Sequence, residues 1–151
     1  MEISNIILGV AGFAALIIPI YIMNKSQQSK ANAELNELLR QTGLDLSHFK
    51  TKENWGKSGF IGITHDKKIV FHPNKEGVHS VQVVSAQDVK AVHLDTTREG
   101  DTHSKIGKIH IGLSTSKGKV DLMIFDHNIH MLLQDELGMA TNWVEKMQAE
   151  V

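Results

Sequence analysis

The chain has no cysteine among its 151 residues and carries a formal charge of only −1. The absence of cysteine excludes disulfides, iron–sulfur clusters, thiolate zinc sites and cysteine nucleophiles. The near-neutral charge excludes a nucleic-acid binder whose affinity comes from bulk positive charge. The sequence also lacks the motifs of a serine-hydrolase elbow, a zinc metalloprotease and a phosphate-binding loop. We therefore expect neither an enzyme nor a cofactor-binding protein, and no nucleic-acid partner.

Near the N-terminus, residues 6–23 form an apolar run without any charge. A helix of about twenty such residues crosses the ~30 Å hydrocarbon core of a bilayer, and this run has no polar face. A cleavable signal peptide is the alternative. However, no basic residue precedes the run, the run is too long, and no A-x-A site follows it. The sequence predicts an uncleaved, single-pass transmembrane anchor over residues 1–24.

Basic residues close to the apolar run lie on its C-terminal side, at Lys25 and Lys30. Because short segments rich in lysine and arginine stay on the cytoplasmic side, the N-terminus is expected outside. The larger C-terminal part is then expected in the cytoplasm.

Residues 25–54 are predicted to connect the anchor to a soluble domain. Three leucines recur there at helical spacing: Leu35, Leu38 and Leu39. With Gly43 placed as a C-cap, they predict a short helix. This helix either continues the membrane helix as a stalk or folds back onto the domain. Residues 44–54 are expected to be irregular, with Leu46 and Phe49 docking onto the domain.

The soluble domain is predicted over residues 55–151, where short alternating apolar runs are separated by turn residues. Six antiparallel strands are expected, at 60–63, 69–72, 78–84, 89–95, 106–115 and 120–125. A polar loop is expected over residues 96–105.

The last element is predicted to be an amphipathic helix that begins at Asp126 or Asn128 as N-cap. Its apolar stripe runs from Ile129 to Met147 and includes Leu132, Leu133 and Trp143. Because the polar face has few basic residues, the stripe is expected to pack on the sheet rather than on a membrane.

Hairpins closed by a C-terminal helix that contains a tryptophan resemble the pleckstrin-homology-like superfold in its bacterial, GRAM-like branch. The resemblance lies in residues 59–72, 85–95 and 130–147. It implies an α+β domain: an antiparallel sheet or partly closed barrel of six to seven strands, capped by the helix. The seventh strand would come from residues 52–57, or the barrel would be incomplete.

The resemblance also implies a function. Small bacterial proteins of this kind display the domain on an inner-membrane anchor as a binding or scaffolding module, with a protein as the expected partner. Some members of the superfold bind anionic lipids through a basic first hairpin. Four lysines lie in or beside the corresponding turn: Lys57, Lys67, Lys68 and Lys75. Asp66 and Glu76 dilute this positive charge, so a simply solvated hairpin is the alternative.

Histidine is unusually frequent, with nine residues. His127 and His130 have the spacing of metal ligands on one helix face, but there is no cysteine to assist them and the carboxylates are scattered. Surface histidines are favoured instead, at turns and on strand faces: His65, His72, His103, His93 and His110. A metal- or pH-responsive membrane regulator is the alternative function, although the sequence does not single out one histidine.

Overall fold

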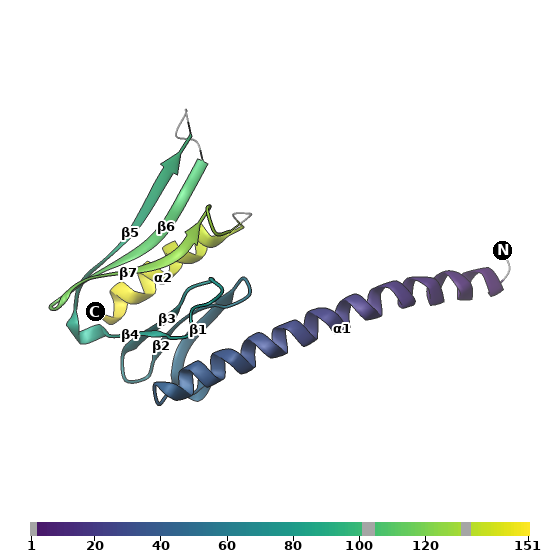
Figure 1. The fold of residues 1–151 in the computed structure, drawn as a ribbon, viewed down its shortest axis with the longest axis horizontal. Coiled ribbons are helices and arrows are strands. Elements are labelled where there is room, and N and C mark those ends of the chain that lie inside the picture. The colour runs from purple at the N-terminus through teal and green to yellow at the C-terminus, as the bar shows by residue number, and fades with distance from the viewer. Residues whose placement is uncertain (1–2, 101–104, 131–133) are drawn as a thin grey trace. The chain divides into compact units, whose positions relative to one another are not determined.

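The computed structural model describes residues 3–100, 105–130 and 134–151. Two compact units make up the chain, Met1–Glu37 and Leu38–Val151. The first unit is helical, and the second holds the strands and the C-terminal helix (Figure 1).

Helix α1 (Ile3–Gln41) continues without a break through Pro19 and beyond the apolar run. It is long and apolar enough to span a membrane. Between residues 6 and 23, these large apolar side chains are more than half exposed: Ile6, Ile7, Val10, Phe13, Leu16, Ile17, Ile18, Ile20, Tyr21, Ile22 and Met23. The short helix predicted around Leu35 is continuous with the rest of α1 and forms its end.

The end of α1 is set by Gly43, as the sequence predicts. Gly43 has φ +76°, a left-handed conformation that glycine adopts readily. Its amide donates to the carbonyl of Arg40, and the amide of Leu44 donates to the carbonyl of Leu39, both at 2.9 Å. This pair of bonds is a Schellman motif, in which Leu39 and Leu44 are both buried.

The expectation that residues 44–54 are irregular is wrong. A 3₁₀ turn, η1 (Leu46–His48), leads into strand β1 (Phe49–Trp55). The side chain of Asp45 caps η1 by accepting from the Ser47 amide at 2.7 Å. Phe49 docks as expected, in an edge-to-face contact with Phe60. The sequence does not reveal this strand, because β1 is an edge strand with five consecutive polar residues, 50–54, and lacks the alternation typical of strands.

In the part of the chain that the structure describes, seven strands form two antiparallel sheets rather than a closed barrel. Sheet A has the order β1-β2-β3-β4 and sheet B the order β5-β6-β7. The bounds of the remaining strands are β2 (Gly59–Thr64), β3 (Lys68–His72), β4 (Gln82–Ser85), β5 (Val89–Glu99), β6 (Lys105–Thr115) and β7 (Gly118–Asp126). The α+β class and the antiparallel pairing are confirmed, and residues 49–55 supply the seventh strand.

The largest differences from the predicted strand boundaries lie at the start of β4 and at the end of β5. The strand expected over residues 78–84 is only β4, because residues 73–81 form a loop. Conversely, β5 and β6 extend into the predicted polar loop, with Thr96 opposite Ile109 and Thr97 opposite Lys108. Threonine is polar but favours strands, so polarity was a poor guide there. Between the two strands, residues 101–104 lie outside the described residues.

Helix α2 (Glu136–Glu150) begins later than predicted. The expected N-caps instead form a turn after β7, in which the Asp126 carboxylate accepts from the Asn128 amide at 3.0 Å. Aspartate serves such turns as readily as helix starts, which explains the error. Leu132 and Leu133, predicted on the apolar stripe, lie outside the described residues.

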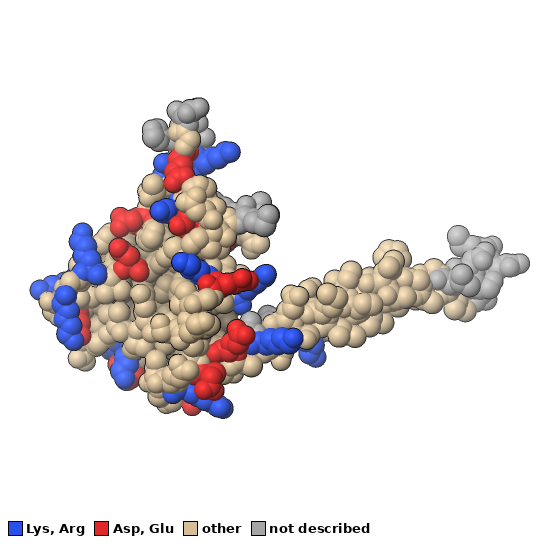
Figure 2. Space-filling view, in the orientation of Figure 1, with Lys and Arg blue, Asp and Glu red and all other residues tan. Residues whose placement is uncertain are grey.

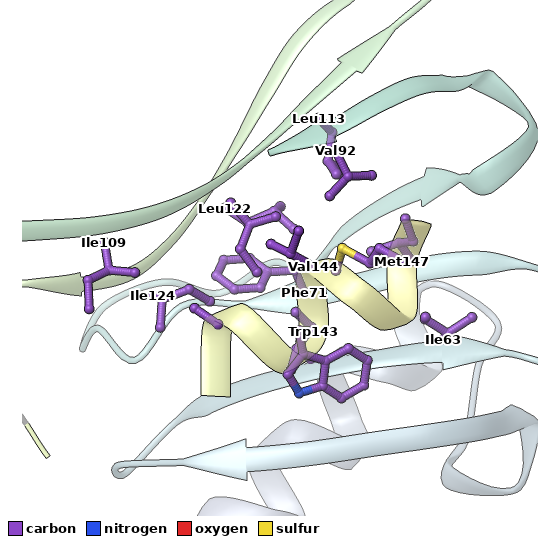
Figure 3. Packing of buried hydrophobic residues seen from close by; sticks show 14 of the residues in the cluster. Ile63, Phe71, Val92, Ile109, Leu113, Leu122, Ile124, Trp143, Val144 and Met147 are labelled. Carbon is purple, nitrogen blue, oxygen red and sulfur yellow. The ribbon is translucent and has the colours of Figure 1, made fainter. Parts of the chain in front are cut away.

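The main core forms where α2 lies between the two sheets (Figure 1). Trp143 is fully buried and extends from α2 toward sheet A, whereas Val144 faces Leu122 of β7 (Figure 3). The indole Nε1–H of Trp143 donates to a carboxylate oxygen of Glu53 on β1, 2.6 Å away. The predicted packing role of Trp143 is confirmed. Its hydrogen bond to Glu53 also connects α2 to β1.

Candidate functional site

The four candidate lysines do not converge. Lys57 lies in the β1–β2 turn and Lys75 in the β3–β4 loop, at one end of β2; Lys67 and Lys68 lie at the other end. A strand of six residues is about 20 Å long at ~3.3 Å per residue. The lysines therefore form two separate pairs rather than one basic patch.

Two of these lysines are paired with the acidic residues beside them. Lys68 Nζ lies 3.0 Å from the Asp66 carboxylate, and Lys57 Nζ lies 3.9 Å from Glu76. A hydrogen bond from the Thr64 hydroxyl, with a further contribution from Lys68, lowers the pKa of Asp66. Blue and red side chains intermingle over the β-rich unit, whereas most of α1 carries no charge (Figure 2). Exposed ion pairs of this kind contribute little free energy, and salt screens them.

His127 and His130 do not share a helix face, because both precede α2. His127 Nε2 lies 3.0 Å from the carboxylate of Glu99. His130 uses both ring nitrogens: Nδ1 accepts from the Asp126 amide at 3.0 Å, and Nε2 faces the carbonyl of Asn74. Within residues 3–100, 105–130 and 134–151, no group of three or more histidines and carboxylates is arranged to hold a metal ion.

Among the other histidines that the structure describes, His72 is buried and the rest lie at the surface or are half-buried. His65 is exposed, while His93 and His110 are half-buried on sheet B, where His93 pairs with Asp95 at 3.1 Å. His103 lies outside the described residues. The predicted surface position of His72 is wrong, because this side chain is only 3% exposed.

His72 is the last residue of β3, and its ring lies between two backbone carbonyl groups. Nδ1 lies 2.8 Å from the carbonyl oxygen of Ser58 in the β1–β2 turn. Nε2 lies 3.0 Å from the carbonyl oxygen of Val78 in the β3–β4 loop. The ring therefore connects the turn to the loop.

Asn74 strengthens the same connection. Its side-chain oxygen accepts from the amides of Lys57 and Ser58, at 3.0 and 3.3 Å. Gly56 makes this approach feasible: it has φ +58°, and a Cβ there would lie 2.0 Å from the Asn74 side chain. Since Nε2 of His130 faces the Asn74 carbonyl, the turn after β7 joins the network as well.

We refer to these residues as the Asn74 cluster: Gly56, Ser58, His72, Asn74, Val78 and His130. The cluster is not arranged for nucleophilic catalysis, because His72 contacts the carbonyl of Ser58 while the Ser58 hydroxyl points to the Pro73 carbonyl. Its hydrogen bonds instead hold the β1–β2 turn, the β3–β4 loop and the turn after β7 together. Sequence reasoning missed the cluster, although the Pro73–Asn74 turn and Gly56 were its available signals.

Comparisons with protein-family models, curated proteins and solved structures gave no match. The resemblance to pleckstrin-homology-like domains therefore stays a prediction.

Proposed function

We propose that this chain is a membrane-anchored, non-enzymatic binding module, in which α1 crosses the membrane and Leu38–Val151 binds a protein partner. The observation that carries the proposal is the exposure of apolar side chains on every side of α1 between Ile6 and Met23. Soluble monomers rarely expose more than a few hundred Å² of contiguous apolar surface. A lipid bilayer covers all faces of such a helix, whereas a single docking surface covers one.

The lysine distribution supports a protein partner over the lipids of the same membrane. Lys57 and Lys75 lie at one end of β2, and Lys67 and Lys68 lie at the other. One lysine of each set is paired with a carboxylate, Lys57 with Glu76 and Lys68 with Asp66. Two separated and partly neutralised sets offer no concentrated charge to an anionic surface.

The side of the membrane follows from Lys25 and Lys30, which favour a cytoplasmic binding module with the N-terminus outside. Together with the resemblance to bacterial proteins, this gives a bacterial inner-membrane protein. Protease treatment of spheroplasts should therefore leave a C-terminal tag on the full chain intact, until the membrane is permeabilised.

Alkaline carbonate extraction of cell membranes tests the anchor itself. The wild-type chain should stay in the pellet, because no lipid-embedded helix is released at high pH. Leu16→Arg combined with Ile20→Arg should move the chain to the supernatant, because placing each arginine in the bilayer costs about 3 kcal/mol. The matched pair Leu16→Val with Ile20→Val keeps the apolar surface and should stay in the pellet. Extraction of the wild-type chain would rule out the anchor.

The lysine pairs distinguish a protein partner from a lipid. The full chain in nanodiscs is mixed with vesicles of purely zwitterionic or 30% anionic lipid. Because two separated lysine pairs concentrate little charge, we expect no greater binding to the anionic vesicles. Anionic-vesicle binding that is lost in Lys67→Gln with Lys68→Gln, but kept in Lys57→Gln with Lys75→Gln, would instead assign a lipid site to the β2–β3 turn.

A further inference from the structure

Only the protonated ring of His72 can donate a hydrogen bond to both of its partners, whereas burial of the ring opposes the added charge. Both ring nitrogens face carbonyl oxygens, of Ser58 and of Val78, and carbonyl oxygens accept but cannot donate. A neutral imidazole has a single N–H, so one nitrogen would turn a lone pair toward an oxygen lone pair. The imidazolium form has two N–H groups and donates to both carbonyls.

His130, in the same cluster, has the opposite preference. Its Nδ1 accepts the amide hydrogen of Asp126, which requires a lone pair on that nitrogen. Its Nε2 faces the Asn74 carbonyl and donates to it. The neutral ring with hydrogen on Nε2 therefore satisfies both partners, and the bond to Asn74 needs no added proton.

Several charged groups surround the cluster. The titratable side chains on the segments that form the Asn74 cluster are Lys57 on the β1–β2 turn, Lys75, Glu76 and His79 on the β3–β4 loop, and Asp126, His127 and His130 at the end of β7 and in the turn after it. Glu76 is paired with Lys57, and His127 with Glu99. The Asn128 amide lowers the pKa of Asp126, which stays ionised. The two carbonyl dipoles are thus the direct partners of the His72 ring.

We propose that His72 is a proton-operated latch on the β3–β4 loop. With His72 protonated, the ring holds the Val78 carbonyl and the Ser58 carbonyl together, and the loop is docked. When the proton leaves, the hydrogen that remains on Nδ1 keeps the shorter bond, to Ser58, and the bond to Val78 is lost. The loop is docked at acidic pH and released near neutral pH.

The release is confined to one part of the loop. Asn74 stays fixed at either pH through Lys57, Ser58 and His130. Gly77, with φ +79° and no atom within 4 Å of the position of a Cβ, lies between this fixed point and Val78. Residues 75–81 therefore move, and they lead directly into β4, an edge strand of sheet A.

The test uses the full chain in detergent micelles at pH 5.5 and pH 7.5. Nitrogen NMR of the imidazole rings should show both nitrogens of His72 protonated at pH 5.5, and only Nδ1 at pH 7.5. Amide hydrogen exchange, corrected for its intrinsic pH dependence, should speed up about fivefold at residues 77–81 at the higher pH, as expected for one lost hydrogen bond. Exchange on β2 and β3 should not change.

Variants separate His72 from its neighbours. His72→Gln cannot titrate and should abolish the pH dependence of exchange at residues 77–81, whereas His110→Gln, on the face of sheet B, should leave it intact. His130→Gln should also leave it intact. A neutral His72 at pH 5.5, or an exchange transition that persists in His72→Gln, overturns the proposal. If His72→Gln does not fold, the ring spectrum of the wild-type chain decides. The latch does not depend on the membrane anchor. A negative carbonate extraction would therefore contradict only the anchor, and a negative result here would contradict only the latch.

Discussion

Trp143 is the residue whose substitution tests the packing of α2 most directly. The side chain is fully buried, and its Nε1–H donates to Glu53 on β1 at 2.6 Å. Phenylalanine at this position keeps an aromatic ring but removes the donor and part of the indole volume. Trp143→Phe therefore breaks the bond between α2 and sheet A while leaving most of the core contact in place.

The expected loss has two parts. A hydrogen bond to a charged acceptor contributes about 1.5–3 kcal/mol, and the lower value suits Glu53, which is only partly buried. The smaller ring leaves a cavity that costs about 1–2 kcal/mol more. Trp143→Phe should lower the free energy of unfolding by about 3 kcal/mol. Glu53→Met should cost about 1–3 kcal/mol, because it leaves the indole N–H unpaired.

A double-mutant cycle isolates the bond itself. Urea unfolding of the full chain in a mild detergent, followed by circular dichroism, gives the free energy for Trp143→Phe, Glu53→Met and the double variant. The coupling energy should be about 1.5 kcal/mol. Trp55→Phe is the control, because its Nε1 donates to the Ile124 carbonyl across a longer 3.3 Å and the loss should be smaller. Additivity of the two substitutions within about 0.5 kcal/mol would refute the bond between α2 and β1.

Gly43→Ala should lower the free energy of unfolding by about 1 kcal/mol, since the strain lies only in the left-handed backbone and no atom lies near the new Cβ. Gly43→Asn should cost less in the same urea assay, and equal losses would contradict a purely conformational cause. The hydrogen bond and attraction from Lys50 hold the pKa of Glu150 below its ordinary 4.5. The stabilisation is complete above pH 4.5 and is lost as the pH falls through the lowered value, so acid should weaken the wild-type chain more than Lys50→Met. Equal losses of the free energy of unfolding on acidification in the two chains would contradict this role of Lys50.

The features that sequence alone predicted correctly depend on local signals. The uncharged run needs only its own residues, and the stop at Gly43 needs only a glycine after the last leucine of the helix. The hairpin of β2 and β3 was found in the same way, because both strands are apolar and a polar turn separates them. In each of these cases the tertiary structure reinforces a preference that the segment already has.

The features that sequence reasoning missed depend on distant partners. β1 is polar at every position from 50 to 54, and it is a strand because β2 pairs with it from Gly59 to Thr64. His72 looked like a surface residue beside Pro73. It is buried because a turn 14 residues away and a loop carbonyl enclose its ring. The bond between His130 and Asn74 joins residues 56 positions apart, and no local pattern encodes it.

The proposed binding module and the proposed latch at His72 are compatible with each other. Lys57 and Lys75 lie on the two segments that His72 connects, so a partner at that end of sheet A would meet a surface whose shape follows the protonation of one ring. Such a partner can shift the loop only by the difference between its affinities for the docked and released forms. If one proton controls about a fivefold change in docking, the partner's affinity can change with pH by at most that factor. A stronger pH dependence of binding would require a second titrating group. His130 is the first to examine, because protonation of its Nδ1 would break the hydrogen bond from the Asp126 amide.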